Sequence, residues 1–146
     1  MSFWDSSALL PLVVNEPASA VARRLVKARG LPVVWWGSLV ECVSALERRF
    51  RAGQLKHDER RESGRLLTEL AGAWSEVQPS QSLRERALRL LSSHNLRAAD
   101  ALQLAAALIW AEERPAGRVF VSLDERLRQA ARQDGFMVLP EDEPGV

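Results

Sequence analysis

Short apolar runs alternate with helix-like segments along the whole 146-residue chain, and this alternation strongly restricts its fold. The run LPVVWW, residues 31–36, is apolar without interruption, which is typical of a strand buried on both faces. Shorter candidate strands lie at residues 1–4, 118–122 and 137–139, and Glu76-Val77-Gln78 before Pro79 is a further one. Strands that alternate with helices predict an α/β fold, with a mostly parallel sheet covered by helices on both faces.

Seven segments between these runs have helical spacing or helix-forming composition, and they lie at residues 8–14, 18–29, 39–53, 66–74, 83–94, 96–113 and 124–133. Ser80 or Ser82 is expected to cap the fifth of these helices. The charged run HDERRESGR, residues 57–65, is interpreted as a solvated helix face and turn. The sequence therefore predicts one domain over residues 1–140, followed by an acidic tail, residues 141–146, that we expect to be flexible.

Charge and cysteine content exclude several classes of protein. The chain has 20 basic and 19 acidic residues, so no overall charge draws it to nucleic acid or to a membrane. A single cysteine, Cys42, allows no internal disulfide framework, and His57 and His94 fit no zinc-binding pattern. No stretch resembles a signal peptide or a membrane span, so we expect a cytoplasmic protein.

Four acidic residues fall where ligands bind in open α/β sheets, at the carboxyl ends of strands or in the first turn of a helix. Asp5 closes the first apolar run, and Glu41 follows LPVVWW by one helical turn. Asp124 comes two residues after RVFVS. Asp100 begins the helix LRAADALQLAAALIWAEE, whose apolar body is suited to burial. All four could therefore point toward one rim of the sheet.

Each of these acids also has a purely structural interpretation, which the sequence leaves open. Ser38 and Glu41 have the spacing of a capping box, and Asp124 could cap the helix that comes after it. Asp100 could be favoured by the positive end of its helix dipole, and Asp5 could cap the first helix.

Convergence of all four acids would favour chemistry over capping. Two carboxylates about 6 Å apart repel by roughly 3 kcal/mol at an effective dielectric constant of about 20. A cluster of this kind needs bound cations or shared protons. Oxygen ligands without histidine or cysteine favour hard cations, Mg²⁺ or Mn²⁺.

The chain resembles the PIN-domain ribonucleases, and among them the VapC toxins of type II toxin–antitoxin systems. Four segments in this order carry the resemblance: FWDSSALLPLVVNEP, SLVECVSAL, LRAADALQLAAAL and VFVSLDERLRQAARQDGF. It implies that residues 1–140 form a PIN-like nuclease domain, a three-layer α/β/α fold with four to five strands. It also implies an endoribonuclease that depends on Mg²⁺ or Mn²⁺.

The resemblance further implies roles for individual residues. The acidic quartet of the family falls on Asp5, Glu41, Asp100 and Asp124. Our hypothesis is that Asp5, Asp100 and Asp124 hold the metal, whereas Glu41 orients the attacking water or holds a second ion. The hydroxyl groups of Ser6 and Ser122 would hold the carboxylates in place.

Three partners are implied by the same resemblance: an RNA substrate, a cognate antitoxin that occludes the acidic pocket with a basic group, and a second copy of the chain in a homodimer. Arg97 is a candidate for contact with RNA phosphate, with Arg126 and Arg128 as weaker ones.

The sequence leaves two other classes of function open. A catalytically silent RNA-binding or scaffold module would keep the fold and use the acids only as caps. A phosphatase or phospho-receiver domain fits poorly, because Asp5-Ser6-Ser7 lacks a second acid and no lysine ends a strand.

Overall fold

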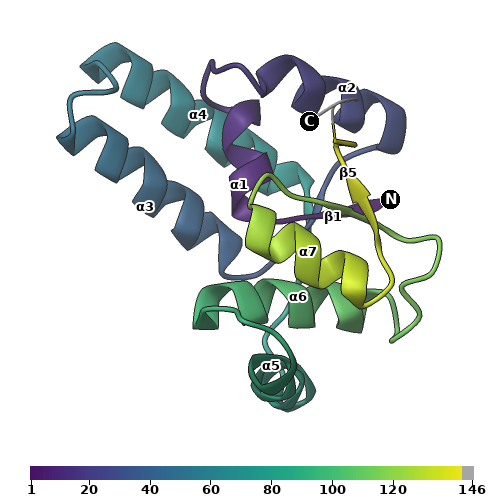
Figure 1. Cartoon of the computed structure of the whole chain (residues 1–146). Coiled ribbons are helices and arrows are strands. Elements are labelled where there is room, and N and C mark those ends of the chain that lie inside the picture. The colour runs from purple at the N-terminus through teal and green to yellow at the C-terminus, as the bar shows by residue number, and fades with distance from the viewer. Residues whose placement is uncertain (143–146) are drawn as a thin grey trace.

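A computed structural model of the chain describes residues 1–142, and five parallel strands form its central sheet (Figure 1). The strands are β1 (Ser2–Trp4), β2 (Val33–Trp35), β3 (Ser75–Val77), β4 (Val119–Val121) and β5 (Met137–Leu139). Their order across the sheet is β3-β2-β1-β4-β5, and every neighbouring pair is parallel. The predicted α/β fold with a mostly parallel sheet is confirmed. Residues 143–146 of the predicted tail lie outside the described residues.

Helices occupy most of the chain between the strands. They are α1 (Ser6–Leu9), the 3₁₀ turn η1 (Leu10–Leu12), α2 (Ser19–Arg29), α3 (Ser38–Arg51), α4 (His57–Ala73), α5 (Gln81–Ser93), α6 (Ala98–Trp110) and α7 (Glu125–Gln133). Ser80 caps α5, because its hydroxyl accepts the Leu83 N–H at 3.1 Å. No helix within residues 1–142 has both the length and the apolar composition needed to cross a membrane.

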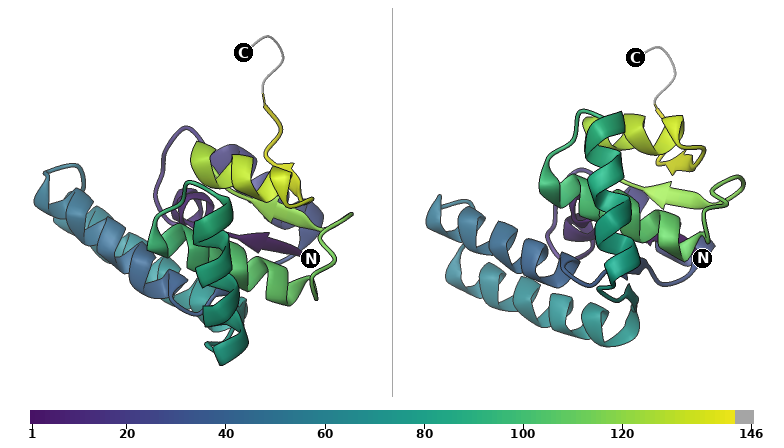
Figure 2. Two further views of the ribbon diagram at one scale, coloured as in Figure 1. Left: turned by 60° about the horizontal axis from the view of Figure 1, so that its bottom comes forward. Right: turned by 90° about the horizontal axis from the view of Figure 1, so that it is seen from below.

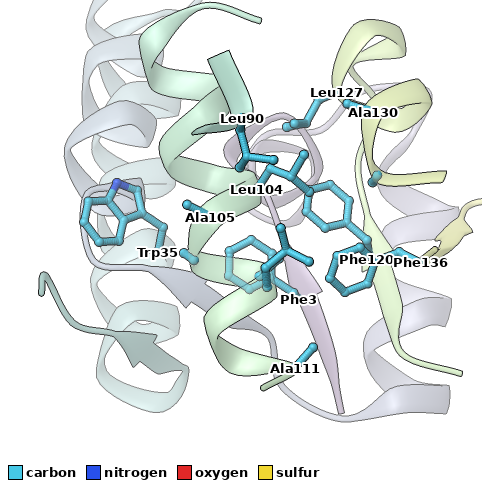
Figure 3. Close-up of a cluster of buried hydrophobic side chains, with 14 of the residues drawn as sticks. Phe3, Trp35, Leu90, Leu104, Ala105, Ala111, Phe120, Leu127, Ala130 and Phe136 are labelled. Carbon is cyan, nitrogen blue, oxygen red and sulfur yellow. The ribbon is translucent and has the colours of Figure 1, made fainter. Parts of the chain in front are cut away.

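Side chains of the strands alternate between two hydrophobic cores, one on each face of the sheet. On β1, Phe3 belongs to one core and Trp4 to the other, and both side chains are fully buried. On β4, Phe120 lies on the face of Phe3, whereas Val119 and Val121 lie on the face of Trp4. The rings of Phe3 and Phe120 stack with centroids 5.5 Å apart (Figure 3). This period of two explains why the strand residues are apolar without interruption.

The helices form the two outer layers of the predicted α/β/α arrangement. Residues of α5, α6 and α7 fill the core around Phe3, and residues of α1 to α4 fill the core around Trp4 (Figures 1 and 2). Two further views show α5 packed across α6 on the outside of its layer (Figure 2). In α6, Ala105 and Ala106 are fully buried, and such small side chains allow the helix to lie close to the sheet.

Two expected elements differ from the structure. The run at residues 57–65 contains no turn, because helix α4 begins at His57 and continues without a break to Ala73. Ion pairs favour this longer helix: Arg60 contacts Glu47 of α3 at 2.7 Å, and Arg65 pairs with neighbours one turn away. The first expected helix is shorter, since Pro11 lacks an N–H and the chain changes from α1 to the 3₁₀ turn η1.

The order of the strands creates a switch point between β1 and β4. From β1 the chain moves to one side of the sheet through β2 and β3, and it then returns to the other side for β4 and β5. The helices that come after β1 and β4 leave in opposite directions, toward opposite faces of the sheet. In open α/β sheets a crevice forms at such a point, outside the carboxyl ends of the strands.

Replacement of Phe120 by alanine is expected to destabilise the protein strongly. Phe120 is fully buried between Phe3 and Phe136, so truncation would remove packing in the central layer at a cost of about 3–5 kcal/mol. Urea unfolding measures this difference. Leu88→Ala is the matched control, because Leu88 is 60% exposed on α5 and should change the unfolding free energy by less than about 0.5 kcal/mol. Equal effects of the two substitutions would contradict the assigned core.

Candidate active site

The four acids reach the switch point from different elements. Asp5 comes directly after β1, and Asp124 lies three residues beyond the end of the neighbouring strand β4. Glu41 lies in the first turn of α3, the helix after β2, and Asp100 lies in the first turn of α6. Their charges act on one another in a chain of pairs, Asp5 with Asp124, Asp124 with Asp100, and Asp100 with Glu41. The structure therefore brings all four acids into one region.

Asp5 is the most deeply buried of these acids, with 4% of its surface exposed. Burial raises the pKa of its carboxyl group from 3.8 to about 7, and the charge of Asp124 adds to this rise. Hydrogen bonds oppose it: the Ser7 hydroxyl lies 2.8 Å from Oδ1 and 3.0 Å from Oδ2, and the Ser122 side chain also contributes. Asp5 is therefore poised to lose or gain a proton near neutral pH.

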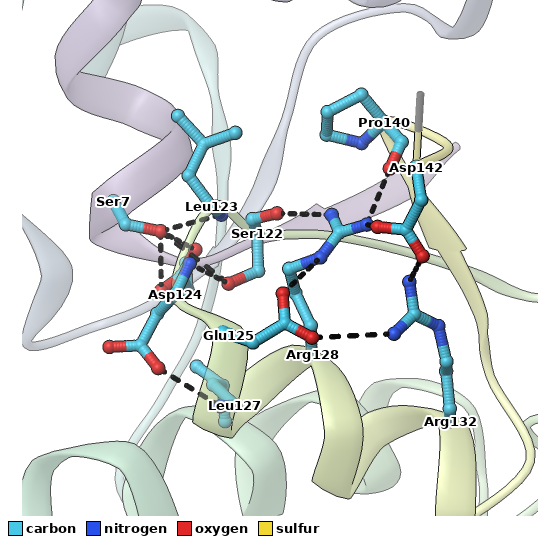
Figure 4. A network of polar contacts seen from close by, with 11 residues as sticks. Ser7, Ser122, Leu123, Asp124, Glu125, Leu127, Arg128, Arg132, Pro140 and Asp142 are labelled. Atoms are coloured by element: carbon cyan, nitrogen blue, oxygen red, sulfur yellow. Dashed lines mark hydrogen bonds and ion pairs between the residues drawn. The ribbon is translucent and has the colours of Figure 1, made fainter. Parts of the chain in front are cut away.

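Asp124 lies at the turn between β4 and α7, where two hydroxyl groups fix the backbone (Figure 4). Ser7 Oγ accepts the Leu123 N–H at 2.9 Å, and Ser122 Oγ accepts the Asp124 N–H at 3.1 Å. Asp124 Oδ1 accepts the Leu127 N–H at 3.0 Å, so this acid does cap α7. The capping interpretation of Asp124 is thus correct, but it occupies one carboxylate oxygen only.

Arg128 holds the same turn from the other side. Only 5% exposed, it donates hydrogen bonds to the backbone carbonyl groups of Ser122 and Pro140, each at 2.7 Å, and to Asp142 at 3.0 Å (Figure 4). Arg128 therefore links the turn that carries Asp124 to the segment after β5. The prediction that Arg128 contacts RNA is wrong, because its guanidinium group is hydrogen-bonded to other residues of the protein.

Glu41 is held by two donors from other parts of the chain. The Ser6 hydroxyl donates to Oε2 at 3.1 Å, and Gln103 Nε2 donates to Oε1 at 3.0 Å and to Ser38 Oγ at 2.9 Å. Burial and, to a smaller extent, the charge of Asp100 raise the pKa of Glu41. The suggested capping box is wrong: Gly37 occupies the cap position of α3, and Ser38 lies within the helix.

Asp100 is half-buried at the start of α6. Burial raises its pKa, and the charge of Asp124 raises it further. The backbone N–H of Arg97 and the positive charges of Arg126 and Arg97 lower it. Arg97 itself is exposed beside this acid, which leaves it accessible to a ligand.

The chemistry of these side chains fits a hard divalent cation. Burial and mutual repulsion raise the pKa of three carboxyl groups, and a cation among them would relieve both effects. As they are placed, no three Asp, Glu, His or Cys side chains of residues 1–142 already form a metal site. For a cation to bind here, some of the four carboxylates would have to move slightly, or water would have to complete the coordination. Cys42 is buried nearby, and desolvation raises the pKa of its thiol to about 12, so this thiol is neutral near pH 7 and a poor nucleophile.

Sequence reasoning missed two residues of this region, Ser7 and Gln103, and it assigned a third, Arg128, to RNA contact instead of to its internal hydrogen bonds. The sequence could have indicated Gln103, because it is a polar residue in a mostly apolar helix and lies three positions after Asp100, on the same side of that helix. The sequence could not have indicated Ser7, because nothing in it distinguishes Ser7 from Ser6. The contacts of Arg128 depend on where β5 ends, which the sequence does not reveal.

The stability of the metal-free protein should fall as the pH rises from 4 to 8. Asp5 has a pKa near 7 in the folded state and 3.8 when unfolded, so the folded state binds the proton more tightly. This stabilisation is fully present below pH 4 and is lost as the pH passes 7. Urea unfolding in a chelating buffer at pH 5 and pH 8 should show the decrease in the wild type and a smaller one in Asp5→Asn. An equal decrease in both proteins would refute the raised pKa.

Comparisons with known proteins agree with this architecture. The PIN domain family matches residues 3–133 of the chain. No curated protein sequence matches it. The fold is similar to the crystal structure of PAE2754 from Pyrobaculum aerophilum, with a TM-score of 0.64 and 20% identity over 94% of this chain and 88% of the other.

A second similar structure is that of VapC20 from Mycobacterium tuberculosis, described as a toxin that cleaves the sarcin–ricin loop. Its TM-score is 0.64, with 18% identity over 89% of this chain and 95% of the other. Similarity at this level of identity establishes the fold, and the family match covers most of the sequence. The chain belongs to the PIN domain family.

Proposed function

We propose that this protein is a metal-dependent endoribonuclease and the toxin of a toxin–antitoxin pair. The observation that carries the proposal is the gathering of Asp5, Glu41, Asp100 and Asp124 at the switch point of the sheet. Burial opposes the ionisation of the first three of these acids. Separate helix caps would have no reason to converge there. Membership of the PIN domain family and the structural similarity to VapC20 support the assignment.

Asp5, Asp100 and Asp124 are the proposed ligands of Mg²⁺ or Mn²⁺. Asp124 shares a charge interaction with each of the other two, so it lies between them in the chain of pairs. Asp124 caps α7 through Oδ1, so its Oδ2 can face the ion. When bound, such an ion lowers the pKa of water and neutralises charge on the phosphate.

Glu41 is the proposed group that orients the attacking water. The water adds to phosphorus in line with the leaving oxygen, the bond from phosphorus to the 3′-oxygen breaks, and that oxygen takes up a proton. Ser6 and Gln103 each occupy a different oxygen of Glu41, which fixes the plane of the carboxylate. Ser122 acts in the same way on Asp5, and Arg97 is a proposed contact for RNA phosphate.

The proposed protein partners are an antitoxin and a second copy of this chain. Three exposed apolar residues lie close in sequence to Glu41, namely Trp36 before α3 and Val40 and Val43 on α3, and they are 51%, 70% and 45% exposed. A partner that covered these side chains could also insert a basic group among the carboxylates, which would block the site by occupying the place of the cation.

A catalytically silent RNA-binding module is the second candidate, favoured by the capping bond that Asp124 does make. It differs from the nuclease in two observable ways. A silent module would not be stabilised by Mg²⁺ or Mn²⁺, and it would cleave no RNA in the presence of either ion.

Asp100→Asn should abolish RNA cleavage and preserve the fold. The amide keeps the size of the side chain but loses the charge that would hold a cation. Purified protein is incubated with structured RNAs and Mg²⁺ or Mn²⁺, with and without a chelator, and the products are separated on a gel.

Asp58→Asn is the matched control for this experiment. Asp58 also lies in the first turn of a helix, but it is exposed at the start of α4, so its replacement should leave cleavage unchanged. Full activity of Asp100→Asn, or activity of the wild type in excess chelator, would refute the mechanism.

Gln103→Met should slow cleavage by about 10- to 100-fold, because Glu41 would lose one of the two donors that orient it. Gln103 is 1% exposed and its Oε1 accepts no hydrogen bond from residues 1–142, so an apolar side chain of similar length should fit in this place. The loss of the Nε2 donor to Ser38 Oγ and Glu41 Oε1 should lower the melting temperature without unfolding the protein. The measurement is kcat and the RNA dissociation constant beside a thermal melt. A lowered kcat with unchanged RNA affinity and a cooperative melt is expected; an unchanged kcat would show that Gln103 does not position Glu41.

A further inference from the structure

A polar pocket adjoins the acidic centre between α7 and the connection from α5 to α6. Its volume is about 620 Å³, within the range of small-ligand sites. Side chains that can donate or accept hydrogen bonds line it, namely Ser93, His94, Asn95, Arg126, Gln129 and Gln133. None of the residues assigned above to the metal or to the attacking water lines this pocket.

Both walls of this pocket lead to an acid of the proposed active site. On α7, Arg126 lies two residues after Asp124, and Gln129 and Gln133 come next at spacings of three and four, which place them on the same helix face. On the other wall, Asn95 precedes the start of α6, where Asp100 lies. The pocket therefore extends outward from the place where Asp100 and Asp124 interact.

The two walls are fixed to each other through His94. One ring nitrogen, Nδ1, lies 3.1 Å from Gln133 Oε1, and the other, Nε2, lies 3.0 Å from Asp134 Oδ1. The imidazole side chain is only 7% exposed. These bonds join the loop after α5 to the end of α7, so the pocket is formed before any ligand arrives, which lowers the entropic cost of binding.

The lining chemistry suits a ribonucleotide. Carboxamide groups such as those of Asn95 and Gln129 carry a donor and an acceptor side by side, which is the pattern needed to bond the edge of an unstacked base. Arg126 supplies a positive charge for phosphate, and the described residues contribute no carboxylate to the lining. An apolar or cationic ligand would find little that is complementary to it.

We propose that this pocket binds a nucleotide of the RNA substrate adjacent to the bond that is cleaved, with Asn95 and Gln129 contacting the base and Arg126 contacting phosphate. The proposal rests on the proposed ribonuclease function and adds to it a determinant of sequence preference. The scissile phosphate would lie at the acids, and the neighbouring nucleotide would occupy the pocket.

The first test measures binding without turnover. Asn95→Ala and Gln129→Ala are made in the Asp100→Asn protein, and fluorescence anisotropy is recorded with a short fluorescein-labelled single-stranded RNA of random sequence. Each substitution should weaken binding about 5-fold, the effect of one lost hydrogen bond in an enclosed site. Gln54→Ala is the matched control, because Gln54 is exposed after α3 and does not line the pocket. Thermal melts verify that all variants fold.

The second test uses Asn95→Ala and Gln129→Ala with Asp100 intact. Sequencing of the ends produced from a mixed RNA pool should show altered base preference at one position next to the cut. Affinities and cleavage sites equal to those of Gln54→Ala would overturn the pocket assignment.

The two proposals fail in different ways. If the wild type cuts RNA but the pocket variants behave like Gln54→Ala, the nuclease assignment stands and the pocket assignment falls. If no RNA is cut with either ion but the pocket variants still weaken RNA binding, the pocket binds a nucleotide but does not select a cleavage position, and the protein is the silent module. Absence of both cleavage and RNA binding would overturn both.

Discussion

Burial of several carboxyl groups at one place is the constraint around which this molecule is arranged. Moving a carboxylate out of water is unfavourable, and like charges nearby make it more so. Asp5 shows the result most clearly, since its pKa rises to about 7 although two serine side chains bond to it. Hydroxyl and amide donors reduce the cost without removing it. The free-energy cost of the buried carboxylates that these donors do not offset gives the site its affinity for protons or for a cation.

The sheet and its two cores determine where this electrostatic cost is concentrated. Strands β1 and β4 are neighbours, and Trp4 pairs with Val121 at their ends, so the acids that come after the two strands emerge at the same edge of the sheet. Asp100 comes from no strand, and it reaches the same rim because α6 packs fully buried alanines such as Ala105 against the sheet. Core packing and site geometry are thus produced by the same residues.

The sequence was sufficient for the layers, the parallel sheet and the family, because these depend on apolar periodicity and on four ordered motifs. It was insufficient for contacts between distant segments. The spacing of Ser38 and Glu41 suggested a local cap, but the competing donors Ser6 and Gln103 come from elsewhere in the chain. The prediction of a turn within residues 57–65 was wrong, because an ion pair between α3 and α4 favours a longer helix. Local patterns could not reveal which long-range partner would prevail.

The Arg128 contacts make the proposed active site sensitive to changes in the segment after β5. The Arg128 guanidinium group holds the Ser122 carbonyl on one side and Pro140 and Asp142 on the other. Removal of the residues after Leu139 would leave a buried cation with fewer acceptors and a looser turn before Asp124. An affinity tag fused directly at Pro140 would strain the same contacts. Purification handles are therefore better placed at the other terminus, or beyond a spacer that leaves Asp142 free to pair.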